Sequence, residues 1–204
     1  SACCRRSVMR EVELKGVVPD AAAAREKLRA AGALLDYAGR LEDKRYDTAE
    51  RGLALTDHVL RHRVYRADPA RSALDWKGPT TYVDGYKVRE EHSVPMGDPD
   101  ALSRILERLG YVVTREIDRE IEQFRLDGAI VRLERYPRMD VLVEVEGEPE
   151  TIERAIKVLG LPRAGFTTMR LPDFVREYEA RTGERAAICD RELDGDYRYS
   201  ATDA

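Results

Sequence analysis

Residues that bind soft metals or form disulfides are scarce in this chain. Among its 204 residues are three cysteines and three histidines. Cys3, Cys4 and Cys189 have neither the spacing of a zinc site nor that of a redox pair, and their odd number argues against a disulfide framework. We therefore expect neither a soft-metal centre nor a fold held together by disulfides.

Long hydrophobic runs and a surplus of positive charge are also lacking. No stretch is apolar over the length needed to cross a membrane, and the first residues lack the apolar segment of a signal peptide. Lys plus Arg number 35 against 39 for Asp plus Glu, which gives a net charge of -4. Nucleic acids and anionic membranes would call for a basic surface. We expect a cytoplasmic protein that binds neither.

Charge itself is abundant, at 36% of all residues, and it follows strand spacing. Glu11, Glu13 and Lys15 alternate with apolar residues, so a strand would place all three on one face. Glu144 and Glu146 repeat the pattern late in the chain. Four carboxylates on the charged side of a sheet predict a cation site. The alternative for any single strand is a solvated face.

Other strand-like segments carry cations, spaced by two or four residues where a segment has a pair, so that a strand would place each pair on one face. These cations are Arg61, Arg63, Lys77, Lys87, Arg89, Arg115 and Arg119. If the sheet curls into a barrel, such polar faces line a tunnel while helices cover the apolar faces outside. Arginine suits bidentate phosphate contacts, and Mg²⁺ or Mn²⁺ takes carboxylate and phosphate oxygens together. The charge pattern therefore predicts a site for a metal-bound polyphosphate.

The order of elements indicates an α+β fold. Strands are expected at 8–18, 33–47, 57–67, 72–77, 82–94, 111–126, 129–136 and 139–147. Helices are expected from Pro19 to Gly32, from Asp98 to Gly110, over about 149–159 and from Pro172 to Gly183. We expect a single domain over residues 1–183 and a polar, loosely ordered tail over 184–204.

Six short motifs occur in a fixed order over residues 10 to about 160. They are Glu11-x-Glu13-x-Lys15, Tyr46-Asp47-Thr48, Leu60-Arg61-x-Arg63, Lys77-Gly78-Pro79, Lys87-x-Arg89-x-Glu91 and Glu144-x-Glu146-Gly147. In this order the chain resembles the CYTH superfamily of triphosphate tunnel metalloenzymes. That superfamily includes class IV adenylyl cyclases, thiamine triphosphatases and inorganic tripolyphosphatases.

The resemblance implies a closed eight-stranded antiparallel β tunnel with a polar lumen and helices packed outside. It assigns triphosphate binding to Lys15, Arg61, Arg63, Lys77, Lys87 and Arg89, together with Arg115 or Arg119. It assigns divalent metal to Glu11, Glu13, Glu144 and Glu146, and it places Glu134 where the family has an aspartate ligand. Lys15 and Lys77 are the expected catalytic cations. Asp140 stands in place of a usual turn glycine, and the family's C-terminal Ser-Tyr element is not visible.

Some roles stay open on the residues alone. Glu91 either binds metal or pairs with a tunnel arginine, and Arg132 either contacts the ligand or pairs with Glu134. Tyr46 and Asp47 either belong to the site or end a strand in a turn.

The function expected from these residues is Mg²⁺- or Mn²⁺-dependent hydrolysis of an inorganic or organic triphosphate. The alternative within the family is a class IV adenylyl cyclase, which converts ATP to cyclic AMP and pyrophosphate. An alternative of another class is a non-catalytic protein that binds nucleotide or polyphosphate. The expected partner is a small-molecule triphosphate, and the sequence is compatible with a homodimer.

Overall fold

The computed structural model describes residues 9–67, 71–195 and 197. The first half of the chain comprises β1 Met9–Val17, α1 Ala21–Ala30, β2 Leu34–Asp47, α2 Gly52–Leu55, β3 Val59–Tyr65, β4 Ser72–Lys77, β5 Thr81–Val83 and β6 Tyr86–Met96. The second half comprises α3 Pro99–Arg108, β7 Val112–Leu126, β8 Ala129–Arg135, β9 Leu142–Glu146, α4 Pro149–Leu159, the short 3₁₀ turn Arg163–Gly165, β10 Phe166–Thr167, α5 Leu171–Thr182 and α6 Asp190–Leu193.

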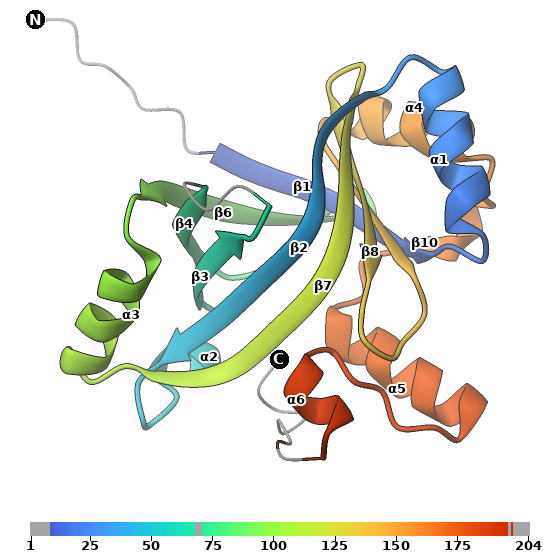
Figure 1. The fold of residues 1–204 in the computed structure, drawn as a ribbon. Coiled ribbons are helices and arrows are strands. Elements are labelled where there is room, and N and C mark those ends of the chain that lie inside the picture. Colours follow the sequence, from blue (N-terminus) through green and yellow to red (C-terminus); the bar gives the residue numbers. More distant parts are fainter. Residues whose placement is uncertain (1–8, 68–70, 196, 198–204) are drawn as a thin grey trace, which may run out of the picture.

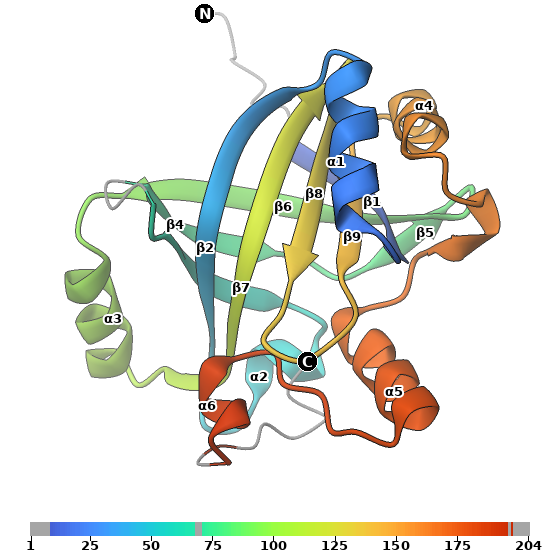
Figure 2. The ribbon, with the colours of Figure 1, turned by 45° about the vertical axis from the view of Figure 1, so that its right-hand side comes forward.

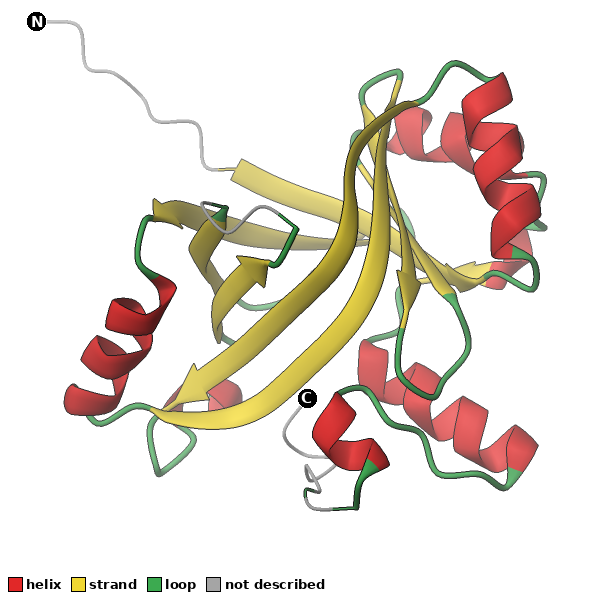
Figure 3. Ribbon diagram, viewed as in Figure 1, coloured by secondary structure: helices red, strands yellow, loops and turns green. Residues whose placement is uncertain are grey.

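Eight of the strands close into an antiparallel barrel. Their order is β1-β9-β8-β7-β2-β3-β4-β6, and β6 pairs back onto β1, while β5 and β10 are short additions. The long strands β2 and β7 run side by side along the barrel (Figures 1 and 3). The closed tunnel expected from the sequence is therefore confirmed. On the ring of eight, β2 lies four strands from β1 in both directions, so these two strands form opposite walls.

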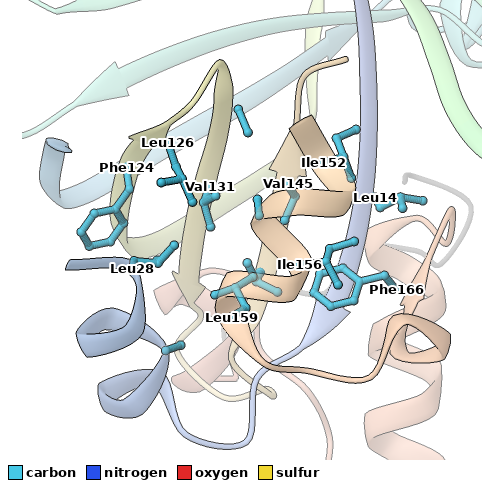
Figure 4. Packing of buried hydrophobic residues seen from close by; sticks show 14 of the residues in the cluster. Leu14, Leu28, Phe124, Leu126, Val131, Val145, Ile152, Ile156, Leu159 and Phe166 are labelled. Atoms are coloured by element: carbon cyan, nitrogen blue, oxygen red, sulfur yellow. The ribbon is translucent and has the colours of Figure 1, made fainter. Parts of the chain in front are cut away.

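The apolar core lies outside the barrel, between the sheet and the helices. Leu14, Val131 and Val145 point from β1, β8 and β9 toward Ile152 and Ile156 of α4 (Figure 4). All five are essentially inaccessible to water, and burial of each such side chain contributes about 1.5–3 kcal/mol. Since strand side chains alternate, placing the apolar faces outward turns the charged faces into the lumen.

The helices begin where the sequence predicts. The Asp20 carboxylate accepts a hydrogen bond from the Ala23 amide at 2.9 Å, and Asp98 accepts one from Ala101 at 2.9 Å, so both aspartates cap their helices. α1 and α4 lie next to each other on one side of the barrel, and α3 covers the far side (Figure 2). Within the described residues, no helix is long and apolar enough to cross a membrane.

Two expectations from the sequence are wrong. The segment 82–94 forms two strands, because Asp84 and Gly85 both adopt left-handed backbone angles (φ 51° and 81°) and turn the chain into a hairpin. The sequence predicts a loosely ordered tail from residue 184, but residues 186–189 are buried. Ile188 accepts a backbone hydrogen bond from Asp118 of β7 at 2.8 Å. Four consecutive apolar residues cover the barrel there despite the polar average of the segment.

Candidate active site

The lumen is a charged cavity of about 370 Å³ to which all eight barrel strands contribute side chains. It is lined by every residue assigned to the site from the sequence except Arg115. These are Glu11, Glu13, Lys15, Arg61, Arg63, Lys77, Lys87, Arg89, Arg119, Glu134, Glu144 and Glu146. Residues that lie far apart in the chain therefore meet in one space, as the barrel register requires.

Three buried glutamates form a carboxylate cluster, defined as Glu11, Glu13 and Glu144. One carboxylate oxygen from each lies within 4.8 Å of the others. The register explains this, since β1 and β9 are neighbours and Glu13 pairs with Glu146 directly across them. Burial, followed by repulsion from Glu11 and Glu144, raises the pKa of Glu146 to about 7. We call these four glutamates on β1 and β9 the acidic wall.

Each glutamate of the carboxylate cluster pairs with its own lysine. Lys77 Nζ lies 2.5 Å from Glu11, Lys87 pairs with Glu13, and Lys15 pairs with Glu144. Burial lowers the pKa of Lys15, but attraction to Glu144 outweighs it and the net pKa is raised. These lysines therefore supply the positive charge that four closely spaced carboxylates need.

The opposite wall is built from arginines around one aspartate. Asp43 of β2 accepts hydrogen bonds from Arg63 Nε at 2.8 Å and Nη2 at 3.0 Å, and it forms ion pairs with Arg119 at 3.1 Å and Arg61 at 3.7 Å. Burial alone would raise the pKa of Asp43, but the arginines hold it well below its usual value. Asp75 of β4 also binds Arg61, at 2.7 Å.

We call this second surface the arginine wall. It consists of Asp43 and Arg45 of β2, Arg61 and Arg63 of β3, and Arg119 of β7. Sequence reasoning missed Asp43 and Arg45. Their spacing of two within the expected strand 33–47 was a usable signal, because it matches that of the neighbouring charged strands.

The structure shows the partners of the residues whose roles the sequence left open. Glu91 pairs with the tunnel arginine Arg61 at 3.6 Å and with Lys77 at 3.1 Å. Arg132 donates to Glu144 at 2.6 Å, and not to Glu134. Glu134 lies outside the carboxylate cluster, since it accepts from Arg119 Nε at 2.9 Å and from the Tyr136 hydroxyl at 2.8 Å. Its assignment as a metal ligand stays a prediction.

Arg115 is buried on β7 but does not line the cavity, whereas Arg119 does. In register, Arg115 lies opposite Arg45 of β2. Arg89, which lines the cavity from β6, donates to the carbonyl oxygens of Gly78 and Asp57, each at 2.7 Å. Of the two β7 arginines left open by the sequence, Arg119 is the one that reaches the lumen.

One mouth of the tunnel is formed by α2 and the start of α5. Asp47 ends β2 and accepts hydrogen bonds from the Leu53 and Ala54 amides at 2.9 Å each, which ties α2 to the mouth. Arg170, just before α5, binds Asp57 at 3.0 Å and Thr80 at 2.9 Å. Asp47 therefore ends its strand in a turn and also lines the cavity, and Arg170 is a rim residue that sequence reasoning missed.

Comparison with known proteins agrees with this geometry. The CYTH domain family model matches residues 9–157, which is most of the chain. The chain belongs to the CYTH family. A search of curated proteins gave no match.

Solved structures share the CYTH fold with this chain at low sequence identity. A Vibrio parahaemolyticus protein put forward as an adenylate cyclase has a TM-score of 0.70 and 19% identity, covering 81% of this chain and 97% of its own. A Pyrococcus horikoshii protein has a TM-score of 0.64 and 24% identity, with 82% and 98% covered. A Hippeastrum protein is put forward as an adenylyl cyclase and reported with a dominant triphosphatase activity. It has a TM-score of 0.58 and 18% identity, covering 86% of this chain and 97% of its own.

Membership of the CYTH family supports a triphosphate-processing activity for this chain. The family depends on divalent metal, and the carboxylate cluster is a feature suited to that dependence. All three of its donors are carboxylate oxygens, the ligands that hard divalent cations take.

Proposed function

We propose that this protein hydrolyses a triphosphate with the help of Mg²⁺ or Mn²⁺. The observation that carries the proposal is the arrangement of the lumen, in which the acidic wall on β1 and β9 faces the arginine wall on β7, β2 and β3. A site for a bare anion would not need carboxylates beside the phosphates. A site for a metal alone would not need arginines opposite, so the pair of walls fits a metal-bound polyphosphate.

The acidic wall would hold the metal through Glu11, Glu13 and Glu144, with Glu146 beside them. A divalent ion bound there supplies positive charge against the phosphate oxygens and lowers the pKa of a bound water. With a cation held by the carboxylates, the ion pairs of Lys15, Lys77 and Lys87 would weaken. Their ammonium groups would then be able to donate to phosphate oxygens of the substrate.

The arginine wall would bind the triphosphate without rearranging. Arg63 is held by two hydrogen bonds to Asp43, and Arg61 by two hydrogen bonds to Asp75 at 3.0 and 2.7 Å. Donors that are fixed before the substrate arrives need no reorganisation when charge develops in the transition state. We propose that this charge is stabilised by Lys15 and Lys77, which lie between the carboxylates that would hold the metal and the space for the phosphates.

The same geometry favours a triphosphate over a diphosphate. Cations approach the lumen from β1, β2, β3, β4, β6, β7 and β8. A short chain would leave several of them without an anion, and unpaired buried charge is costly. Hydrolysis requires only a positioned water in addition, whereas cyclisation requires a pocket that aligns the ribose hydroxyl. We therefore propose inorganic tripolyphosphate or a small organic triphosphate as the substrate.

The test is to incubate the protein with tripolyphosphate, thiamine triphosphate or ATP, each with Mg²⁺ or Mn²⁺, and to separate the products by chromatography. We expect orthophosphate and the corresponding diphosphate, and turnover slower by about a hundredfold or more in Glu13→Gln prepared in parallel. Cyclic AMP and pyrophosphate as the main products from ATP would replace hydrolysis by cyclisation. Tight binding without turnover of any substrate would show a non-catalytic binder.

A further inference from the structure

One arginine of the lumen was not expected from the sequence and forms no ion pair with a carboxylate in the described part of the chain. Arg45 lines the cavity from β2. Its buried Nε has no hydrogen-bond partner, and its guanidinium forms no ion pair with any residue in the described part of the chain. Arg61, Arg63 and Arg119 each bind at least one carboxylate. Arg45 therefore lacks the direct carboxylate contact that the other three arginines have, and Asp43 attracts it only from a longer distance.

The neighbours of Arg45 add positive charge around it. In register it lies opposite Arg61 on one side and opposite Arg115 on the other. Burial, followed by repulsion from Arg115 and Arg61, lowers the pKa of Arg45 to about 9 although Asp43 attracts it, so the side chain still carries its charge at neutral pH. A half-buried cation without a directly bound counter-ion is costly, and a bound anion is the partner that would remove this cost.

The place of Arg45 on the ring of strands shows which anion would reach it. β2 is four strands from β1 in both directions, so Arg45 lies on the wall opposite Glu11 and Glu13. An anion held at the acidic wall and long enough to cross the lumen meets Arg45 on the far side. We propose that Arg45 is a further substrate-binding residue, which donates to the phosphate oxygens that face away from the acidic wall. This inference rests on the proposed function and adds a residue to its site.

The test is calorimetric binding of the imido analogue of tripolyphosphate, which resists hydrolysis, in Mg²⁺ buffer. Arg45→Gln should weaken binding by about tenfold to a hundredfold, the loss expected for a charge-assisted hydrogen bond. The matched control is Lys44→Gln, which removes the same charge from the next residue of β2. Lys44 is exposed and its nearest carboxylate, Glu116, is 3.9 Å away, so its loss should change binding less than about twofold. Arg45→Lys should recover part of the affinity.

The melting temperature of the ligand-free protein separates binding from a structural role. Arg45→Gln removes repulsion from Arg61 and Arg115, so without ligand this variant should melt at the same temperature as the wild type or higher. The analogue should raise the melting temperature of the variant less than it raises that of the wild type. A lower melting temperature without ligand would show that Arg45 is structural and would overturn the inference.

Unchanged affinity in Arg45→Gln, with tripolyphosphate still hydrolysed by the wild type, would remove Arg45 from the site and leave the proposed function standing. A wild type that neither binds the analogue nor turns over a triphosphate would remove both.

Discussion

The acidic wall and the arginine wall both contain buried charges, but these charges are paired with different kinds of side chain. On the acidic wall, carboxylates are close together, and each member of the carboxylate cluster is balanced by a lysine. On the arginine wall one aspartate, Asp43, is shared by three arginines, two of which also bind another carboxylate: Arg61 binds Asp75 and Arg119 binds Glu134. Lysine is a mobile point charge on a flexible stem, whereas arginine forms a fixed fork with a carboxylate. The difference indicates that the acidic wall can exchange its lysines for a metal, while the arginine wall is already set for an anion.

The largest expected effect comes from the acidic wall. Excess chelator should abolish turnover, and added Mg²⁺ or Mn²⁺ should restore it. Glu13→Gln should lower kcat by about a hundredfold or more, because metal-bound water and charge stabilisation each contribute several kcal/mol. The concentration of metal that gives half-maximal rate should rise as well. Steady-state kinetics over a metal titration measures both effects.

The control for Glu13→Gln is Glu177→Gln, which removes an exposed carboxylate from the surface of α5. It should behave as the wild type. Full activity of the wild type in chelator would contradict the role given to the acidic wall.

The next effect tests Asp43 as the support of the arginine wall. Asp43→Asn leaves Arg63 and Arg119 with a neutral partner, and breaking a buried ion pair in this way costs about 3–5 kcal/mol. Denaturant unfolding should show this loss. Tripolyphosphate should raise the melting temperature of Asp43→Asn more than that of the wild type, because its oxygens replace the missing charge. Unchanged stability would mean that the arginines do not depend on Asp43.

A smaller effect is expected for single arginines of the same wall. Arg63→Ala should weaken triphosphate binding by about 1.5–3 kcal/mol, as expected for one charge-assisted contact, with a smaller change in kcat. The comparison variant is Arg66→Ala. Arg66 is an exposed arginine just after the end of the same strand, and it binds Glu42 at 2.7 Å. Its affinity should stay within about twofold of the wild type. Equal affinity in both variants would remove β3 from the binding site.

Much of the fold could be predicted because alternation and helix capping are local properties. The charged faces of β1 and β9 and the capping residues Asp20 and Asp98 can be read from a few neighbouring residues. Residues 186–189 could not be placed this way, since their burial depends on β7, which lies far earlier in the chain.

The site was predicted less completely than the fold. Most of its assignments from the sequence came from motifs, so several charged lumen residues outside the motifs were missed, Asp43 and Arg45 among them. The partner of Arg132 depends on the register of β8 against β9, which pairs Arg132 with Glu144 rather than with its own strand neighbour Glu134. Register is a property of the closed barrel, and no single strand contains it.

The smallest effect concerns pH and the fourth glutamate of the acidic wall. Burial, with repulsion from Glu11 and Glu144, raises the pKa of Glu146 to about 7, above its usual value of 4.5. At a pH well below that usual pKa, the Glu146 carboxyl is protonated in both the folded and the unfolded protein. It then does not lower the free energy of unfolding. As the pH rises from 4.5 to about 7 the unfolded state ionises first, so the folded protein loses stability, and the full penalty is present above the raised pKa.

Glu146→Gln should therefore be more stable than the wild type by about 1–3 kcal/mol at about pH 8 in chelator, and nearly equal to it at about pH 4.5. Denaturant unfolding at the two pH values measures this difference. Saturating Mg²⁺ should reduce the gain at the higher pH, because a bound cation stabilises the ionised carboxylate in the wild type. A gain of the same size at both pH values would show that the introduced glutamine stabilises the fold by packing, and that repulsion within the acidic wall is not the cause.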